Sequence, residues 1–333
     1  HPARAFDFAR PAAAAALTLP APAQDTPSSE DGQTLVYAAT ETPFAFVPHT
    51  PAEAADGLVA TAREAFEGGP WRRMPVTERA AIMRKISALI MENADELARL
   101  QTLETSIVIS QSGGMHVSRT AENFTFFADL LAGHAGESYE QSGRYLSIVT
   151  REPVGIAVLI APWNAPLVLA SMKLAAALSL GNSVILKPSE YAPLAVLRLV
   201  ELVHEAGVPD GVVQVACGTG PGIGNALVAH PGVDVVGFIG GTETGKRIMA
   251  TAAGSLKKVG LELGGKSANI ILASADLERA VDGSLLGIYA GNGEQCLAGS
   301  RMLVEDSVAD EFIAAFVARS KALKIGDPFD PAS

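Results

Sequence analysis

Cys296 lies in the glycine-flanked turn GNGEQCLAGS, where a thiol can be exposed and reactive. Glu262 in LELGGK stands at the end of an apolar run, where its carboxylate can act as a general base. Asn164 in APWNAP supplies an amide donor after another such run. Each residue has an ordinary alternative: a buried inert thiol, a solvated edge acid, or an Asn that satisfies its own turn.

Two glycine-rich stretches point to a phosphate ligand. GFIGGTETGKRI matches a P-loop from Gly240 through Lys246, but Arg247 replaces the Ser or Thr that would hold magnesium. The same stretch offers backbone N–H groups at a helix N-terminus, which favour a pyrophosphate. In CGTGPGIG the third glycine of the Rossmann fingerprint falls on Ile223 or Asn225, and a structural turn is the alternative. The two incomplete fingerprints indicate a dinucleotide held in a nonstandard way.

These residues follow short apolar runs that alternate with helical stretches from Val154 onward. The runs are VGIAVLI, SVILK, VVQV and VDVVGF. Continuous Val/Ile-rich strands separated by helices predict an α/β fold, a doubly wound parallel sheet covered on both faces. Such sheets bind ligands beyond the carboxyl ends of their strands. We therefore expect APWNAP, KPSE, CGTGPG and IGGTETG to lie together.

Helices are predicted before this sheet. Thr50 and Glu53 have the spacing of a capping box for a helix that ends near Phe66. A second helix is predicted from about Thr77 to Arg99.

Two further units flank the sheet region. Residues 137–153 alternate like a two-stranded antiparallel arm around Gly143. After Gly265 the strand ANIIL, a helix from Asp276, the strand RMLV and a helix from Val308 indicate the opening of a second domain.

Composition excludes several classes of function. The 333 residues are 48% apolar and carry a net charge of −11, with no cluster of Lys and Arg to bind nucleic acid. No apolar run approaches the ~20 residues of a membrane helix, and two cysteines provide neither a disulfide framework nor a zinc site. A soluble protein of a reducing, cytoplasmic compartment is expected. The first residues faintly resemble a secretory signal, and a floppy Ala/Pro terminus is the alternative.

The ordered set APWNAP, KPSE, GFIGGTETG, ELGGKS and GEQCLAGSR closely resembles the aldehyde dehydrogenase superfamily from about Pro48 onward. This resemblance implies an NAD-binding domain (48–134 and 154–264), an oligomerisation arm (135–153) and an incomplete catalytic domain (265–333). It leaves 1–47 irregular or disordered. It also implies a homodimer or homotetramer if full length.

The resemblance assigns roles by position. Cys296 would be the nucleophile and Glu262 the base, with Asn164 and the Cys296 backbone N–H as the oxyanion hole. Lys173 matches a lysine that relays protons, and Lys187 and Glu190 match the grip on the adenosine ribose. The positions expected to contact NAD are Ile160, Ala161, Pro162, Trp163, Lys187, Ser189, Glu190, Gly220, Gly224, Phe238, Gly240, Gly241, Gly245, Glu262, Leu263 and Gly264.

The substrate is expected to be a small aldehyde bound by Arg119, Asn164 and Cys296. SRTAENFTFFADL looks like the branch that oxidises carboxylated semialdehydes of muconate type, in which Arg119 suits a distal carboxylate. The alternatives are a helix-surface arginine and a substrate such as betaine aldehyde. Ile239 and Gly241 replace the Thr and Ser common in the family's pyrophosphate turn. Because the chain lacks the rest of the catalytic domain, a non-catalytic relative is the second hypothesis.

Overall fold

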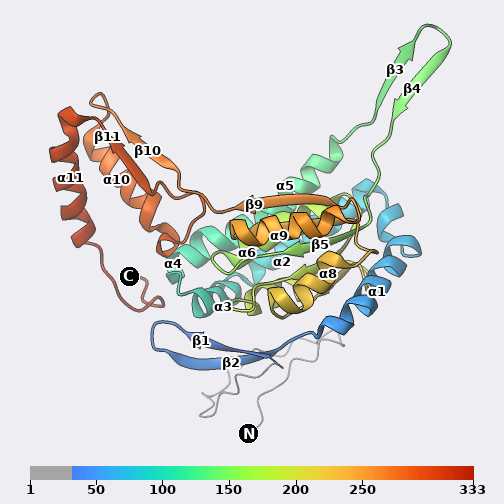
Figure 1. Cartoon of the computed structure of the whole chain (residues 1–333), viewed down its shortest axis with the longest axis horizontal. Coiled ribbons are helices and arrows are strands. Elements are labelled where there is room, and N and C mark those ends of the chain that lie inside the picture. Colours follow the sequence, from blue (N-terminus) through green and yellow to red (C-terminus); the bar gives the residue numbers. More distant parts are fainter. Residues whose placement is uncertain (1–31) are drawn as a thin grey trace.

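The computed structural model describes residues 32–333, and a five-stranded parallel sheet lies at its centre (Figure 1). The strand order is β7-β6-β5-β8-β9. The bounds are β5 Ile156–Ile160, β6 Ser183–Lys187, β7 Val213–Val215, β8 Val235–Gly240 and β9 Lys258–Leu263. The order reverses between β5 and β8, so the expected doubly wound α/β fold is confirmed.

The sheet is buried on both faces because its strands are almost entirely apolar. Ala157 and Leu159 face one hydrophobic core, whereas Ile156 and Val158 face the other, as the alternation of a strand requires. The first core includes helices α2 (Val76–Glu92), α3 (Ala94–Thr105), α5 (Ser118–Ala132), α6 (Pro166–Ser179) and α7 (Leu194–Glu205). The second includes α1 (Ala55–Glu67), α8 (Asn225–Ala229) and α9 (Thr242–Ala253).

The N-terminal part differs from the sequence-based expectation. Residues 32–47 are not irregular, because β1 (Gly32–Tyr37) and β2 (Thr42–Pro48) pair as an antiparallel hairpin. The alternation of apolar and polar residues there is too short and imperfect to identify a strand from the sequence. Residues 1–31, with the signal-like start, lie outside the described residues.

Two helix expectations also need correction. The predicted capping box does not form: the chain enters a 3-10 turn, η1 (Ala52–Ala54), whose N-cap is Pro51 without a side-chain cap. The long helix predicted from 77 to 99 is two helices, α2 and α3, separated at Asn93. The Asn93 side chain donates to the Leu89 carbonyl oxygen, which ends α2. The remaining short elements are η2 (Trp71–Arg73), α4 (Ile109–Gln111), η3 (Ser112–Val117), η4 (Gly220–Gly224) and η5 (Ala290–Gly293).

The antiparallel arm is present and projects away from the sheet (Figure 1). Its strands are β3 (Glu137–Gln141) and β4 (Tyr145–Val149). The turn between them contains Ser142 and Gly143, both with positive φ. Nearly all of the side chains in both strands are exposed.

The last part of the chain forms a smaller unit with its own apolar cluster. Strands β10 (Ala268–Ile271) and β11 (Arg301–Val304) pair in parallel, and α10 (Leu277–Tyr289) and α11 (Asp306–Lys321) pack on them. The chain then returns to the hairpin, where the Tyr37 hydroxyl donates to Asp327 at 2.7 Å. No helix among the described residues is long and apolar enough to span a bilayer.

Candidate active site

The carboxyl edge of the sheet gathers most of the expected residues. Ile160 pairs with both Lys187 on β6 and Phe238 on β8, so the loops after these strands start side by side. The order of strands reverses there, and open α/β sheets bind ligands at such a crevice. From β5 come Ile160, Ala161, Pro162, Trp163 and Asn164; from β6, Lys187, Ser189 and Glu190; from η4, Gly220 and Gly224; and from β8, α9 and β9, Phe238, Gly240, Gly241, Gly245, Glu262, Leu263 and Gly264.

Lys187 is held firmly at the end of β6. It is only 2% exposed, and its Nζ donates to the Pro188 carbonyl oxygen at 3.1 Å and lies 3.5 Å from a Glu190 carboxylate oxygen. Burial lowers the Lys187 pKa, and the Glu190 charge opposes that shift. A Cβ added to Gly224 would meet the Lys187 side chain at 3.4 Å, so η4 packs closely on this lysine. A paired lysine and carboxylate at this edge suit ribose hydroxyls.

The glycine turn before α9 has space for an anion. Gly241 is the N-cap of α9 and provides no side-chain cap, and its own Cβ position is open. Gly245, in contrast, is closely packed, because a Cβ there would lie 2.7 Å from a Leu263 methyl group and would displace that side chain. Uncapped N–H groups at a helix start favour a pyrophosphate. Lys246 pairs with Glu243 on the helix surface at 2.7 Å.

The thiol turn is built from residues in unusual backbone conformations. Gly291, Asn292 and Gly293 have φ values of 57°, 58° and 75°, in the left-handed region. Cys296 follows them and is exposed. A Cβ on Gly265 would lie 3.0 Å from the Cys296 carbonyl oxygen, so the chain leaving β9 passes directly against this turn.

Asn164 connects the β5 loop with the thiol turn. Its Nδ2 donates to the Glu294 carbonyl oxygen at 2.6 Å. An amide nitrogen has two hydrogens, so one remains for another acceptor. Burial raises the pKa of the neighbouring Glu294 carboxyl group.

Lys173 and Glu262 interact across the same edge. Burial lowers the Lys173 pKa and the nearby Glu262 carboxylate opposes that shift. The Lys173 side chain lies over β8, where a Cβ on Gly237 would meet its Cδ at 3.3 Å. The lysine thus extends from α6 towards the end of β9.

Arg119 lies in the first turn of α5, as the sequence predicted for the start of a helix. Its guanidinium is exposed and pairs with Glu122 at 3.4 Å in the same helix. This pairing fits the interpretation as a surface arginine, and no described hydrogen bond or ion pair links Arg119 to Asn164 or to the thiol turn.

Two residues that contact the thiol turn were not found from the sequence. Gln111 accepts a hydrogen bond from the Gly291 N–H group, and Asn292 donates to carbonyl oxygens at the end of α3. The only signal was the turn-forming triplet GNG before Cys296.

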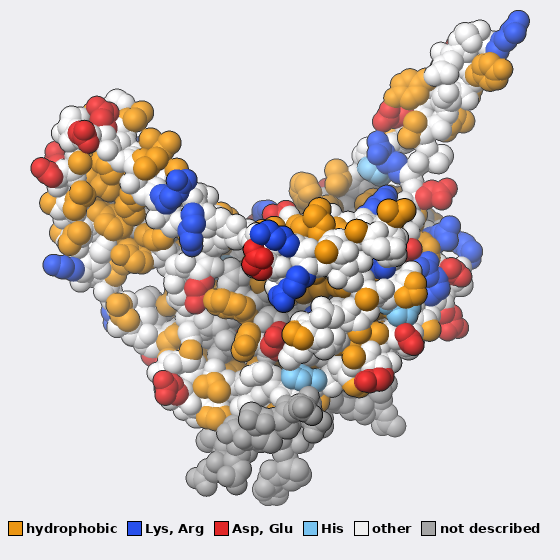
Figure 2. Space-filling view, viewed as in Figure 1, with side chains coloured by type: hydrophobic (Ala, Val, Ile, Leu, Met, Phe, Trp, Pro, Cys, Tyr) orange, Lys and Arg blue, Asp and Glu red, His pale blue; other side chains and the backbone are white. Residues whose placement is uncertain are grey.

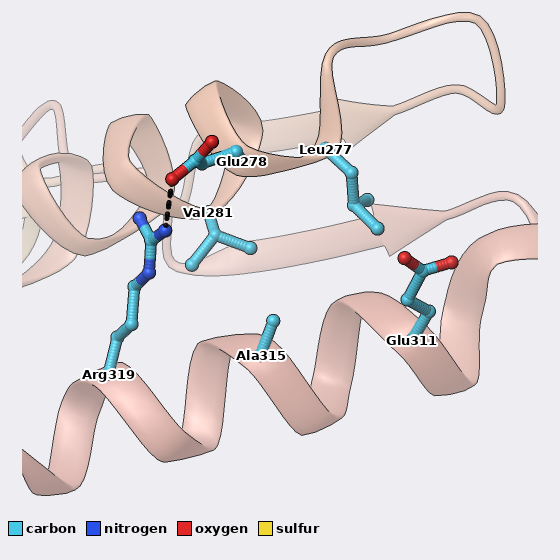
Figure 3. A pocket seen from close by; sticks show the side chains of 6 residues that line it. All are labelled: Leu277, Glu278, Val281, Glu311, Ala315 and Arg319. Atoms are coloured by element: carbon cyan, nitrogen blue, oxygen red, sulfur yellow. Dashed lines mark hydrogen bonds and ion pairs between the residues drawn. The ribbon is translucent and has the colours of Figure 1, made fainter.

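A surface hollow lies away from this edge. It has a volume of about 210 Å³ and is formed between α10 and α11, with Val281 and Ala315 on its apolar floor and Arg319 paired with Glu278 at one end (Figure 3). It contains none of the expected site residues. The described residues also provide no group of three His, Cys, Asp or Glu side chains that could bind a metal.

The fold and this edge define a class of protein: an α/β dinucleotide-binding protein with an exposed thiol on a turn that an amide donor and the chain leaving β9 both contact. The particular family follows from comparison with known sequences. The chain belongs to the aldehyde dehydrogenase family, whose profile matches residues 26–333. The match therefore begins before Pro48, where the resemblance was expected to start, because it includes the β1–β2 hairpin.

Similar proteins include enzymes with different substrates. The chain is 43% identical to 5-carboxymethyl-2-hydroxymuconate semialdehyde dehydrogenase of Escherichia coli, over 82% of this chain and 57% of that protein. It is 42% identical to betaine aldehyde dehydrogenase of Bacillus subtilis, over 81% of this chain and 55% of that protein. The NAD+ complex of an aldehyde dehydrogenase from Bacillus cereus superposes with a TM-score of 0.89 at 40% identity, covering 91% of this chain and 62% of that one. The chain thus spans less than two thirds of the length of these relatives.

Proposed function

We propose that the protein takes part in NAD-dependent oxidation of an aldehyde to a carboxylic acid, with Cys296 as the nucleophile. The observation that carries this proposal is the hydrogen bond from Asn164 to the turn that bears the exposed Cys296. It brings an amide donor to the thiol-bearing turn at the edge where open α/β sheets bind ligands. The chain from Glu262 passes against the same turn at Gly265.

The side chains divide the reaction between them. The Cys296 thiolate attacks the aldehyde carbon, and the resulting oxyanion receives hydrogen bonds from the free Asn164 N–H and the Cys296 backbone N–H. When this oxyanion collapses to the thioester, a hydride leaves the former aldehyde carbon, and bound NAD would supply the acceptor for it. The thioester on Cys296 is then hydrolysed by a water molecule that Glu262 deprotonates. Lys173 lies near Glu262 and passes its proton onward.

The residues at the carboxyl edge fit NAD. The uncapped start of α9 would hold the pyrophosphate, and Lys187 with Glu190 would hold the adenosine ribose. Glu190 would repel a 2′-phosphate, so NAD is preferred over NADP. The relative from Bacillus cereus, crystallised with NAD+, supports this assignment.

For the substrate we propose a carboxylated semialdehyde, held through its distal carboxylate by Arg119. The E. coli semialdehyde dehydrogenase supports this class, but a betaine aldehyde dehydrogenase is nearly as similar. The proposal also includes the NAD-binding domain (48–134 and 154–264), the arm (135–153), the catalytic part (265–333), a homo-oligomeric state and a cytoplasmic location.

Variants of the two cysteines and of Glu262 test the reaction. Cys296→Ala should abolish aldehyde oxidation and leave NAD binding intact, whereas Glu262→Gln should form an acyl adduct on Cys296 and then stall. The matched control is Cys217→Ala, because Cys217 is buried and desolvation raises its pKa to about 12. Mass spectrometry after exposure to aldehyde and NAD locates the adduct.

The opposite results separate the hypotheses. A Glu262→Gln variant that binds NAD but forms no adduct would contradict the division of labour between thiol and base. A wild-type chain that binds NAD without oxidising any aldehyde, and whose Cys296 labels no faster than in the unfolded chain, would favour the non-catalytic alternative.

A further inference from the structure

The turn before Cys296 requires external support. Gly291, Asn292 and Gly293 all have positive φ, and an Asn tolerates this conformation less well than glycine does. Such a run of left-handed residues has many alternative conformations, so surrounding contacts must select this one.

The support comes from a segment far away in the sequence. The Asn292 Nδ2 donates to the Ser106 carbonyl oxygen at 3.0 Å and lies 3.5 Å from that of Thr105. The Gly291 N–H donates to the Gln111 Oε1 at 2.9 Å. We call the side chains of Gln111 and Asn292, with the carbonyl groups of Thr105 and Ser106, the turn clamp.

The segment on the other side of the clamp is itself rigid. Ser106 ends α3 in a left-handed conformation, so the carbonyl groups that Asn292 contacts belong to a helix C-terminus that lacks intrahelical donors. Directly after Gln111, the buried Ser112 hydroxyl accepts hydrogen bonds from Thr102 at 3.0 Å and Gln101 at 3.2 Å. The clamp therefore fastens the thiol turn to a well-packed part of the first core.

The turn is fixed at two points, both of which precede Cys296 in the chain. The clamp holds Gly291 and Asn292, and Asn164 holds the Glu294 carbonyl oxygen. Two anchors so close to Cys296 leave its backbone little freedom. We propose that Gln111 and Asn292 are positioning residues that set Cys296 against Asn164. This inference rests on the proposed function for its kinetic consequence, but the geometry of the thiol is testable without it.

Two substitutions remove the clamp's hydrogen bonds and spare the backbone. Asn292→Gly deletes the amide but favours the left-handed conformation even more. Gln111→Leu deletes the acceptor, and Gln111→Glu keeps an oxygen there as the conservative rescue. Ser142→Gly, at a left-handed position in the arm turn, is the matched control for added glycine flexibility.

The readouts are the rate of Cys296 alkylation across pH, NAD affinity, thermal melting and steady-state kinetics. We expect Asn292→Gly and Gln111→Leu to lower kcat about tenfold or more, because small misplacements of a reacting group are costly. Their rates of Cys296 alkylation should change from that of the wild type and approach that of the unfolded chain. NAD affinity should stay within about twofold, and Gln111→Glu and Ser142→Gly should behave like the wild type.

A lower melting temperature with an unchanged alkylation profile and kcat would overturn the proposal, because the clamp would then merely cap α3. Alkylation is measured without aldehyde or NAD. An inactive wild-type chain would therefore contradict the proposed function. A changed Cys296 alkylation profile in the clamp variants would still support the positioning role.

Discussion

The Asn164 amide has two hydrogens, and the structure accounts for one of them. The hydrogen bond to the Glu294 carbonyl oxygen orients the amide and restrains the thiol turn at the same time. The second hydrogen is the one proposed for the oxyanion. An ionised Asp at this position would have no hydrogen to donate to the Glu294 carbonyl oxygen or to the proposed oxyanion. Both interactions therefore require an amide side chain.

At the residue scale, a variant of Arg119 tests the proposed substrate class. We expect Arg119→Ala to lower kcat/KM for a carboxylated semialdehyde about ten- to a hundredfold, because a charge-assisted hydrogen bond contributes about 1.5–3 kcal/mol. A neutral aldehyde of similar size should be affected little. Glu122→Ala is the matched control, since it breaks the Arg119 ion pair and leaves the guanidinium in place. Equal losses on both aldehydes would assign Arg119 to the helix surface.

Single residues could be predicted from the sequence where a short motif shows both the reactive group and its local surroundings. Cys296 and Asn164 were singled out because a thiol in a glycine-rich turn and an amide after a strand are informative locally. The structure places the Asn164 amide against the turn that bears Cys296, and the catalytic roles of both residues stay a prediction. Gln111 and Asn292 were missed because their contacts join segments about 180 residues apart. No local pattern shows which backbone groups will need a partner.

Between elements, Glu104 joins α3 to α7. Its carboxylate accepts hydrogen bonds from the N–H groups of Leu194 and Ala195, at the start of α7. Desolvation nevertheless raises the pKa of Glu104 to about 8, against the opposing effect of these two donors. Glu104 therefore caps α7 from another helix, and its neighbour Thr105 belongs to the turn clamp.

The raised pKa has a definite consequence for stability. With this raised pKa the folded chain keeps the Glu104 proton up to about pH 8, whereas the unfolded chain loses it near the ordinary glutamate pKa of 4.5. The stabilisation that is linked to the raised Glu104 pKa is fully present below pH 4.5 and is lost as the pH rises to about 8. Over this range the free energy of unfolding falls by up to about 1.4 kcal/mol per pH unit. We expect Glu104→Gln to remove that slope, since glutamine does not titrate.

Urea unfolding at pH 5, 6, 7 and 8 measures the effect. The exposed Glu53→Gln is the control. Parallel pH profiles for the wild type and Glu104→Gln would show that Glu104 does not titrate in this window.

The elements divide into those specified by local patterns and those specified by packing. The strands of the sheet were predictable because short, continuous Val/Ile runs that alternate with helical stretches are usually buried strands. The run SVILK, for example, is β6 with the same bounds. The division of one predicted helix at Asn93 was not, because Ile and Leu continue at helical spacing across it. The β1–β2 hairpin depends on packing against the first core through Leu35 and Val47.

At the scale of the whole molecule, apolar side chains gather on two surfaces that project from the central sheet (Figure 2). One is formed over α10 and α11, where Leu286 and Ile313 are exposed. The other is the arm, where Tyr145 is 69% and Leu146 and Ile148 are each 65% exposed. Two-stranded hairpins are marginal alone and offer unpaired edges, so an apolar, projecting hairpin is suited to contact a second copy.

We expect the double variant Leu146→Ser/Ile148→Ser to lower the molar mass measured by light scattering from that of an oligomer towards that of a monomer. The physical reason is the loss of two exposed apolar side chains from the surface that we assign to self-association. Cys296 alkylation should be unchanged, because no described hydrogen bond links the arm to the thiol turn. Leu256→Ser is the matched control, as Leu256 is 92% exposed but lies outside the arm. If the wild-type chain is monomeric at micromolar concentration, or if the double variant keeps the wild-type mass, the arm is not the contact surface.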